Sequence, residues 1–338
     1  MAAMFYGVDI DKETMKNQFL SKCNEHLNQR IAMCSSSEDK PFSEDKPIYR
    51  NICVWNIANA QRDETFCPLK SRLQGIIDYI KGLTEMPDIL VLLEANRPSQ
   101  GVPWTMMAAD IEAQTGLRYH SCHTVNATPN SFGKAVFFNV NTVALKNVHH
   151  FWITEEEKSE RWSGPYFGND VIILEIFPVE NQKVIIDKIL KLGVVHFPMG
   201  KEDRLMASKW LRFFSGFANI WMGDYNTFPD DGGQEMIDII TEFELIHQNP
   251  KDTNEMTFQA YEHDCIEKDI SFIPQLNSAS TFKPKEDDPS KILVRFSSVL
   301  DHVFTDPNID CKVIINPLCP FSDHALISAK TSFSPYYI

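Results

Sequence analysis

The sequence predicts an α/β fold in which two mixed β-sheets pack face to face and helices cover the outer faces. Apolar strand-like runs alternate with amphipathic helical stretches, and other short strands follow one another as hairpin-like pairs. Polar residues recur where the apolar runs end, which is where a rigid sheet presents functional loops. With 338 residues, 43% of them hydrophobic, the chain is long enough for one large domain or two small ones.

The individual elements follow from periodicity and from the residues that end helices. Apolar residues at helical spacing form one stripe over 69–83, which Pro87 closes, and Gly116 closes a second helix. Strands are expected at 49–57, 88–93, 119–123, 134–138, 170–177, 298–304, 312–315 and 325–329, with a further strand closed by Gly223 and two apolar pieces within 183–195. Helices are expected at 69–83, 104–114, 202–214 and 234–243. The segment 249–296 is expected to be irregular and polar.

The stretch from Trp221 to Asp231 carries the clearest functional signal in the chain, and the polar residues at the other strand ends are interpreted together with it. An apolar run beginning at Phe213 predicts a buried strand that delivers its end to this loop. Asp224 and Asn226 alternate, so we expect their side chains to point the same way. A carboxylate can position or deprotonate a water, and an amide can donate to a phosphate oxygen. The alternative is an ordinary polar turn, because Gly, Asp, Asn and Pro are common turn residues.

Other strand ends carry side chains of the same kinds. Glu94 follows five apolar residues, and burying it unpaired would be costly, so a metal or another cation should lie beside it. Each residue also has a structural alternative: Asn56 as a turn cap, Glu94 as a solvated strand end, His196 as a hydrogen-bonded core histidine, and Asp301-His302 and Asp323-His324 as unrelated surface pairs.

Taken together, these residues match one kind of chemistry. Three carboxylates and an asparagine offer the oxygen ligands that Mg²⁺ prefers, two histidines can contact a phosphate, and one aspartate can orient a histidine. That inventory suits metal-assisted attack of water on a phosphorus ester. The sequence contains neither a G-x-G-x-x-G fingerprint nor a Walker loop, which excludes the obvious nucleotide-cofactor interpretations.

The short motifs that contain these residues, and their order along the chain, resemble those of the endonuclease/exonuclease/phosphatase superfamily. This superfamily includes DNase I, the abasic-site endonucleases, the deadenylases, the inositol polyphosphate phosphatases and the neutral sphingomyelinases. The resemblance covers about residues 48–331, and its most specific motif is Gly223-Asp224-Tyr225-Asn226. The other motifs are Val54-Trp55-Asn56-Ile57, Asp88 to Glu94, Val195-His196-Phe197-Pro198 with Arg204, Leu300-Asp301-His302-Val303-Phe304, and Ser322-Asp323-His324.

Three positions depart from the common pattern without removing a catalytic group. Leu93 stands where many members have glutamine, Tyr225 replaces a commoner phenylalanine, and His302 replaces an aromatic residue or arginine. Thr227-Phe228-Pro229 is similar to the deadenylase-like branches, whereas the inositol phosphatase pattern is not found after Asn226.

The resemblance implies a four-layer α/β sandwich, of the DNase I type, with one site that depends on Mg²⁺ or Mn²⁺. Asp224 would position and deprotonate the attacking water, and Asn226 and His196 would hold the scissile phosphate. His324, oriented by Asp301, would stabilise charge on the phosphoryl oxygens. The implied metal ligands are Glu94, Asn56 and Asp323.

The charge of the chain narrows the expected substrate. The net charge is −14, from 32 basic and 46 acidic residues, and no Lys/Arg-rich run offers a track for duplex DNA. A phosphodiester in a nucleotide, or in a short or single-stranded nucleic acid, therefore fits best. The alternatives are an inositol phosphatase, a sphingomyelinase-type lipid phosphodiesterase, or a catalytically silent binding module. Aromatic residues available for base stacking, or for packing at the rim of the sandwich, are Trp104, Trp162, Tyr166 and Phe228.

Residues 1–47 differ in composition from the catalytic domain expected at 48–338. A short helix is expected within 15–33, and Ser37-Glu38-Asp39-Lys40-Pro41 recurs after Phe42 as a charged, low-complexity linker. No secretory signal or transmembrane stretch is found, and none of the eight cysteines forms a C-x-x-C pair. An intracellular protein, in the cytoplasm or nucleus, is expected, and no protein partner can be identified from the sequence.

Overall fold

A computed structural model describes most of the domain that the sequence predicts after residue 47. The residues described are 47–57, 69–95, 104–124, 133–152, 170–198, 200–227, 232–242, 244–250, 257–261, 294–317, 322 and 324–335. The predicted helix and linker of the N-terminal extension lie outside these residues and stay predictions.

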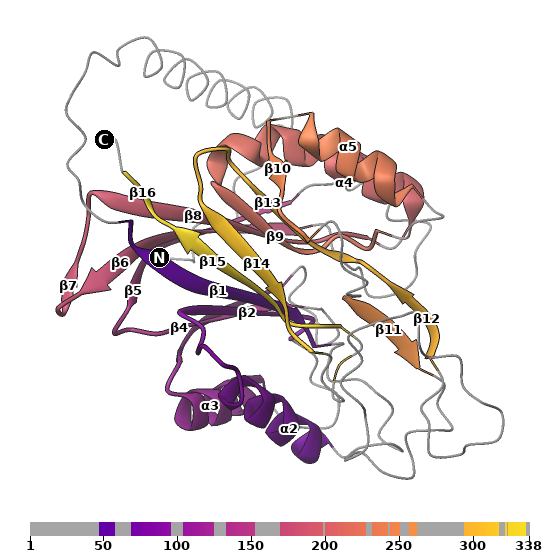
Figure 1. The fold of residues 1–338 in the computed structure, drawn as a ribbon. Coiled ribbons are helices and arrows are strands. Elements are labelled where there is room, and N and C mark those ends of the chain that lie inside the picture. Colours follow the sequence, from indigo (N-terminus) through magenta and orange to yellow (C-terminus); the bar gives the residue numbers. More distant parts are fainter. Residues whose placement is uncertain are drawn as a thin grey trace, which may run out of the picture. The chain divides into compact units, whose positions relative to one another are not determined.

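Among the described residues, the first sheet is built from six strands: β1 (Tyr49–Asn56), β2 (Ile89–Leu93), β3 (Arg118–Thr124), β4 (Gly133–Phe138), β14 (Cys311–Ile315) and β15 (Ile327–Ser332). They lie in the order β14-β15-β1-β2-β4-β3 (Figure 1). The central pair, β1 and β2, is parallel, and all the other neighbours in this order are antiparallel.

The second sheet repeats this plan with β5 (Val143–Trp152), β6 (Asp170–Glu180), β8 (Lys188–His196), β9 (Ile220–Asp224), β10 (Ile246–His247) and β13 (Asp301–Thr305). Their order is β10-β13-β9-β8-β6-β5, and the parallel pair is β8 and β9. Short strands β7 (Lys183–Val184) and β16 (Ser334–Pro335) pair with β6 and β8. A separate hairpin joins β11 (Phe258–Tyr261) to β12 (Val294–Ser298).

Helices cover the outer face of each sheet (Figure 1). The helices α2 (Leu69–Lys81) and α3 (Trp104–Thr115) lie on the first sheet, and α4 (Lys201–Phe214), followed by a 3-10 turn at Ser215–Phe217, and α5 (Gly233–Thr241) lie beside the second. The order of layers is helix, sheet, sheet, helix, so the predicted four-layer sandwich is confirmed. The helices that the structure describes are too short and too polar to cross a membrane.

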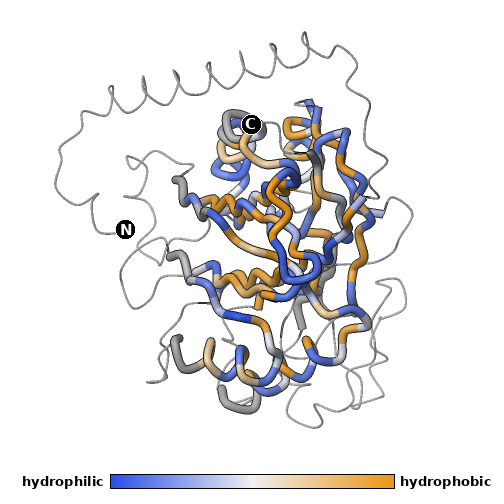
Figure 2. Tube along the Cα trace, turned by 90° about the vertical axis from the view of Figure 1, so that its left-hand side faces the viewer, coloured by the Kyte–Doolittle hydropathy of each residue, from blue (hydrophilic) through white to orange (hydrophobic). Residues whose placement is uncertain are grey.

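Strand alternation divides the interior into layers of apolar side chains. Val54 faces the second sheet and belongs to the core between the sheets, whereas Cys53 and Trp55 on either side of it pack toward α2 and α3. The apolar stretches of the chain accordingly gather in the middle of the described part (Figure 2). Gly193 in β8 lies under the ring of Trp221 in β9, where a Cβ would come within 2.2 Å of the ring, so glycine is required there.

Four parts of the sequence-based prediction need correction. The apolar run from Phe213 is not all strand, because Phe213 and Phe214 complete the amphipathic helix α4 and β9 begins only at Ile220. The strand β5 was missed, since polar residues and a register shift between Leu145 and Asn147 interrupt its apolar pattern. The segment predicted to be irregular over 249–296 contains β11 and the start of β12, and the strand predicted at 298–304 is divided between β12 and β13.

Candidate active site

The carboxyl ends of the two parallel strand pairs meet at one edge of the sandwich. Asn56 ends β1 and Glu94 follows β2, while His196 ends β8 and Asp224 ends β9. Three of these side chains continue an inward-facing alternation, with Asn56 two residues after Val54, His196 after Val194, and Asp224 after Met222. The candidate site is therefore the polar end of the apolar core between the sheets.

The side chain of Asn56 joins the acidic groups of the two sheets. Its Nδ2 donates to Oε1 of Glu94 at 3.2 Å and to Oδ2 of Asp224 at 3.0 Å. Nε2 of His196 lies 3.6 Å from the same Glu94 oxygen and 3.7 Å from the same Asp224 oxygen. Asn56, His196 and Asp224 are all buried, so these contacts are formed away from bulk water.

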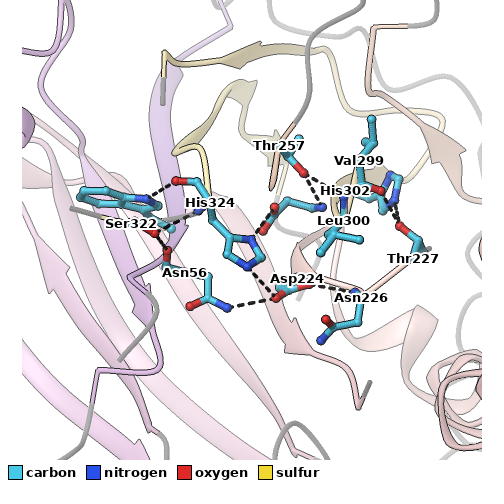
Figure 3. Close-up of polar contacts among 12 residues, drawn as sticks. Asn56, Asp224, Asn226, Thr227, Thr257, Val299, Leu300, His302, Ser322 and His324 are labelled. Carbon is cyan, nitrogen blue, oxygen red and sulfur yellow. Dashed lines mark hydrogen bonds and ion pairs between the residues drawn. The ribbon is translucent and has the colours of Figure 1, made fainter. Parts of the chain in front are cut away.

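A second histidine, His324, also contacts Asp224 (Figure 3). Nε2 of His324 lies 3.6 Å from Oδ2 of Asp224, and its Nδ1 lies 3.0 Å from Oδ2 of Asp301. Asp301 is placed by register, because it pairs directly with Asp224 across the antiparallel strands β13 and β9. Asp301 and His324, which are 23 positions apart in the sequence, are therefore within hydrogen-bond distance.

The turn after β9 has an unusual backbone. Asn226 adopts φ 51°, its N–H donates to Oδ1 of Asp224 at 2.8 Å, and its Nδ2 donates to the carbonyl oxygen of Phe197 at 2.6 Å. This left-handed turn, and not strand alternation as predicted, sets the direction of the Asn226 side chain. Gly223 precedes it at φ 148°, where a Cβ would lie 2.0 Å from the carbonyl oxygen of Val195.

The electrostatics of the site favour a bound cation. Burial raises the pKa of Asp224 to about 7, Asp301 adds to the rise, and His324, the Asn226 N–H and Asn56 oppose it. Asp224, Asp301 and His324 offer ligand atoms within 4.8 Å of one another, and Glu94 and Asn56 adjoin them. Buried carboxylates in this number fit a hard divalent ion, which offsets the cost of burying their charge. Asp323, the third predicted metal ligand, lies outside the described residues.

Solved structures of the same overall fold are similar to this chain. An endonuclease/exonuclease/phosphatase family protein from Bacteroides thetaiotaomicron superposes with a TM-score of 0.59 at 15% identity, covering 86% of this chain and 99% of that chain. The chain has the endonuclease/exonuclease/phosphatase fold. At such low identity the likeness concerns the fold, and no protein-family model or curated protein matches the sequence itself.

Other structures with the endonuclease/exonuclease/phosphatase fold have more specific names. Danio rerio TDP2, complexed with a single-strand DNA product, has a TM-score of 0.52 at 12% identity, covering 84% of this chain and 98% of that chain. ANGEL2, a 2′,3′-cyclic phosphatase in complex with adenosine-2′,3′-vanadate, has a TM-score of 0.52 at 13% identity, covering 88% and 99%. A mannosyl-6-phosphatase from Bacteroides thetaiotaomicron has a TM-score of 0.54 at 12% identity, covering 83% and 99%.

Several residues that support this candidate site were not singled out from sequence. Nε1 of Trp55 donates to the carbonyl oxygen of His324 at 2.9 Å. Ser322 Oγ donates to the carbonyl oxygen of Asn56 at 2.6 Å and accepts from the N–H of His324 at 3.1 Å (Figure 3). Thr257 Oγ1 accepts from the N–H groups of Leu300 and Asp301. Trp55 and Ser322 stood inside quoted motifs, but no spacing signal pointed to Thr257.

Lys134 is a further residue at this edge that sequence analysis missed. It is 3% exposed and stands at the start of β4, next to Gly133, whose carbonyl oxygen accepts from the N–H of Ala95. Because β4 runs antiparallel to β2, its first residues lie beside the end of β2, where Glu94 stands. Alternation places Lys134 on the same face as Val136, which belongs to the core between the sheets. A Gly-Lys pair directly before an apolar run is the signal that could have identified it.

Four aromatic residues were predicted to be available for base stacking. Trp104 begins α3, and Trp162, Tyr166 and Phe228 lie outside the described residues. Their stacking role, and the alternative of packing at the rim, stay predictions.

Tyr225, between Asp224 and Asn226, carries a hydroxyl that is buried without a hydrogen-bond partner among the described residues. Its ring packs against Phe197 and Phe304, and burial raises its pKa well above the ordinary value. Removing an unsatisfied buried hydroxyl relieves a desolvation cost, so Tyr225→Phe is expected to raise the free energy of unfolding by about 1 kcal/mol. Urea denaturation measures this change.

Tyr79→Phe is the matched control, because the Tyr79 hydroxyl donates to the carbonyl oxygen of Pro317. This second variant is expected to lose stability. A loss of stability in Tyr225→Phe would show that its hydroxyl is satisfied.

Proposed function

We propose that this protein is a divalent-metal-dependent phosphodiesterase that cleaves a phosphorus ester by attack of water. The observation that carries the proposal is the convergence of Glu94 and Asp224 on one asparagine, with the Asp301–His324 pair beside them. Two buried aspartates, the partly buried Glu94, an asparagine and two histidines lie at the shared edge of the two sheets. Together they supply charge neutralisation and positioning, which phosphoryl transfer needs most.

In this proposal Asp224 activates the attacking water. Its Oδ1 accepts the N–H of Asn226, which leaves Oδ2 directed toward Asn56, His196 and His324. Burial raises the proton affinity of this carboxylate, as a general base requires. A water held by Oδ2 would be deprotonated as it attacks the phosphorus atom.

The two histidines and Asn226 would bind the phosphate. Asp301 occupies Nδ1 of His324, so Nε2 is the ring nitrogen that faces the reacting group. Nε2 of His196 approaches the center from the other sheet. Asn226 uses Nδ2 to bind Phe197, which fixes the amide plane close to the phosphate position.

The metal would be held by Glu94 and by Oδ1 of Asn56, since Nδ2 of Asn56 already donates to the two carboxylates. Asp323 is proposed as a third ligand. A bound Mg²⁺ or Mn²⁺ would supply positive charge to the phosphoryl oxygens and to the leaving oxygen.

The proposed substrate is a nucleotide or the end of a single-stranded nucleic acid. A net charge of −14 disfavours tracking along a duplex, because affinity for duplex DNA comes mainly from basic contacts to phosphates. The names of TDP2 with a single-strand DNA product and of ANGEL2 with adenosine-2′,3′-vanadate support this class. The name of the mannosyl-6-phosphatase supports the second candidate, a phosphatase acting on a small phosphorylated molecule.

A substrate panel tests this proposal. The purified protein is offered single-stranded DNA and RNA oligonucleotides, plasmid duplex, sphingomyelin, inositol phosphates and mannose 6-phosphate, each with Mg²⁺ and with EDTA. Turnover of the single-stranded oligonucleotides is expected with Mg²⁺ and not with EDTA. Turnover of only the lipid, inositol or sugar phosphates would overturn the substrate class, and turnover that persists in EDTA would overturn the metal dependence. Inactivity on the whole panel would favour a binding module.

A further inference from the structure

Behind the candidate site, on the opposite face of β13, a chain of polar side chains begins at His302. Asp301 and His302 are adjacent in the strand, so their side chains point to opposite faces: Asp301 to His324, and His302 away from it. His302 is 3% exposed and lies among the rings of Tyr225, His247 and Phe304. None of the roles assigned above uses this buried imidazole.

The hydrogen bonds of this chain determine where its protons are. The single hydroxyl proton of Thr227 goes to the carbonyl oxygen of Val299, 2.6 Å away, because a carbonyl can only accept. Nε2 of His302 lies 2.5 Å from Thr227 Oγ1 (Figure 3). Because this hydroxyl already donates to Val299, its oxygen accepts from Nε2 of His302, and this nitrogen therefore carries a proton. The Val299 backbone also hydrogen-bonds to His302, which fits the same assignment. Nδ1 of neutral His302 in turn accepts from Nε2 of His247, 2.9 Å away.

The neutral form of His302 is the one its surroundings favour. Burial, and then the neighbouring His247, hold the pKa of His302 well below its ordinary value, while a hydrogen bond with the Val299 backbone acts to raise it. Protons are therefore ordered in one direction, from the half-buried His247 to His302, then to Thr227, and finally to a backbone carbonyl.

This chain ends on the turn that carries Asn226. The turn has two anchors, one on each side of Asn226: the N–H of Tyr225 donates to the carbonyl oxygen of Leu300 at 2.8 Å, and Thr227 binds Val299 and His302. Val299 and Leu300 lie just before Asp301, and His302 follows it in β13. Since Asn226 has a left-handed backbone, the turn needs such anchors to keep its conformation.

We propose that His302 is a positioning residue, whose Nε2–H ties Thr227 to β13 and so fixes the turn that presents Asn226. His247 acts through His302, because its donated proton holds the imidazole in the tautomer that can donate to Thr227. The inference rests on the proposed function, since Asn226 is positioned for the phosphate of that reaction.

The tautomer is tested first, on the full chain without substrate. Two-bond ¹H–¹⁵N spectra of the histidine side chains are expected to show His302 as the neutral Nε2–H tautomer. An Nδ1–H tautomer or an imidazolium at neutral pH overturns the proposal.

The second test measures amide hydrogen exchange in two variants. His302→Phe keeps an aromatic ring among its neighbours, and Thr227→Val keeps the shape of the side chain while removing the hydroxyl. Each is expected to accelerate exchange of the Asn226 amide by about tenfold or more, as local opening does, with the amides of β8 unchanged. Equal acceleration in both places would show a merely structural role and overturn the proposal. If His302→Phe does not fold, Thr227→Val decides.

Kinetics give the third test and include a rescue. His302→Phe and Thr227→Val are each expected to lower kcat by about tenfold, because small displacements of positioning groups are costly. His302→Gln is expected to recover most of this loss, since its amide nitrogen can donate to Thr227. A kcat unchanged in His302→Phe, or a Gln variant as slow as the Phe variant, overturns the proposal.

The chain offers a matched control for the threonine change. The hydroxyl of Thr331 is buried and has no hydrogen-bond partner among the described residues, and it lies in β15 away from the site. Thr331→Val is expected to leave kcat and Asn226 exchange unchanged. An inactive wild-type protein would contradict the proposed function alone, and the tautomer and exchange results would still decide the role of His302.

Discussion

Glu94→Ala is expected to reduce metal-dependent turnover to background while the protein stays folded. Glu94 stands at the end of a fully buried strand, and its Oε1 receives the Asn56 amide and faces His196. Its removal takes away the main proposed ligand for the divalent ion, and the remaining groups bind a hard cation less well when one carboxylate is lost. Titration calorimetry with Mn²⁺ and initial rates over a range of Mg²⁺ concentrations measure the two effects.

Glu85→Ala is the control for this experiment, because Glu85 is an exposed glutamate whose described partner is Lys330 on the surface. Surface ion pairs contribute little, so this variant is expected to keep wild-type metal binding and turnover. Metal-dependent turnover retained by Glu94→Ala would remove Glu94 from the metal site, and a large loss of melting temperature would show a structural role instead.

Asp224→Asn is the second change with a large expected effect. It keeps the shape of the side chain and removes the base, so single-turnover rates at saturating Mg²⁺ are expected to fall by about 10² or more. Oδ1 can still accept the Asn226 N–H, but an amide nitrogen at Oδ2 would face the Nδ2 donor of Asn56. Part of the loss can therefore come from this repulsion, and thermal unfolding of the variant measures that part separately.

Asp306→Asn makes the same chemical change away from the proposed chemistry. The Oδ2 of Asp306 accepts from Nδ2 of Asn219, as Asp224 accepts from Asn56, but Asp306 follows the other end of β13. This variant is expected to keep the wild-type rate. A loss of only a few fold in Asp224→Asn would assign Asp224 a structural role.

Much of the fold could be predicted because its signals are local. The helices over 69–83, 104–114, 202–214 and 234–243 were recognisable from apolar spacing and from closing residues, and α2 to α5 occur there. The individual strands of the two parallel pairs were visible as apolar runs, whereas their pairing was not predicted. The missed strand β5 and the hairpin of β11 and β12 have weaker patterns, because polar residues interrupt them and their pairing depends on distant neighbours.

The site was predicted as a set of residue types at strand ends, and the structure brings seven of the eight together. Asp323 lies outside the described residues, and the assigned roles of all eight stay proposals. The structure of the N-terminal extension, the intracellular location and the role of the aromatic residues in base stacking also stay predictions. Lys134, Thr257 and the partners of His302 were not predicted, since their importance comes from contacts with segments far away in the chain.

By itself, the sequence determined which side chains would stand at the ends of buried strands, because a period of two places each residue on one face or the other. The close approach of the Val195 carbonyl oxygen that requires glycine at Gly223 was found only in the structure. Only the tertiary structure decided that the ends of β1, β2, β8 and β9 share one edge, since this depends on parallel pairing between distant segments and on the packing of two sheets. The same packing decided that His302 faces away from Asp301 and binds Thr227, because one residue along a strand reverses the face to which a side chain points.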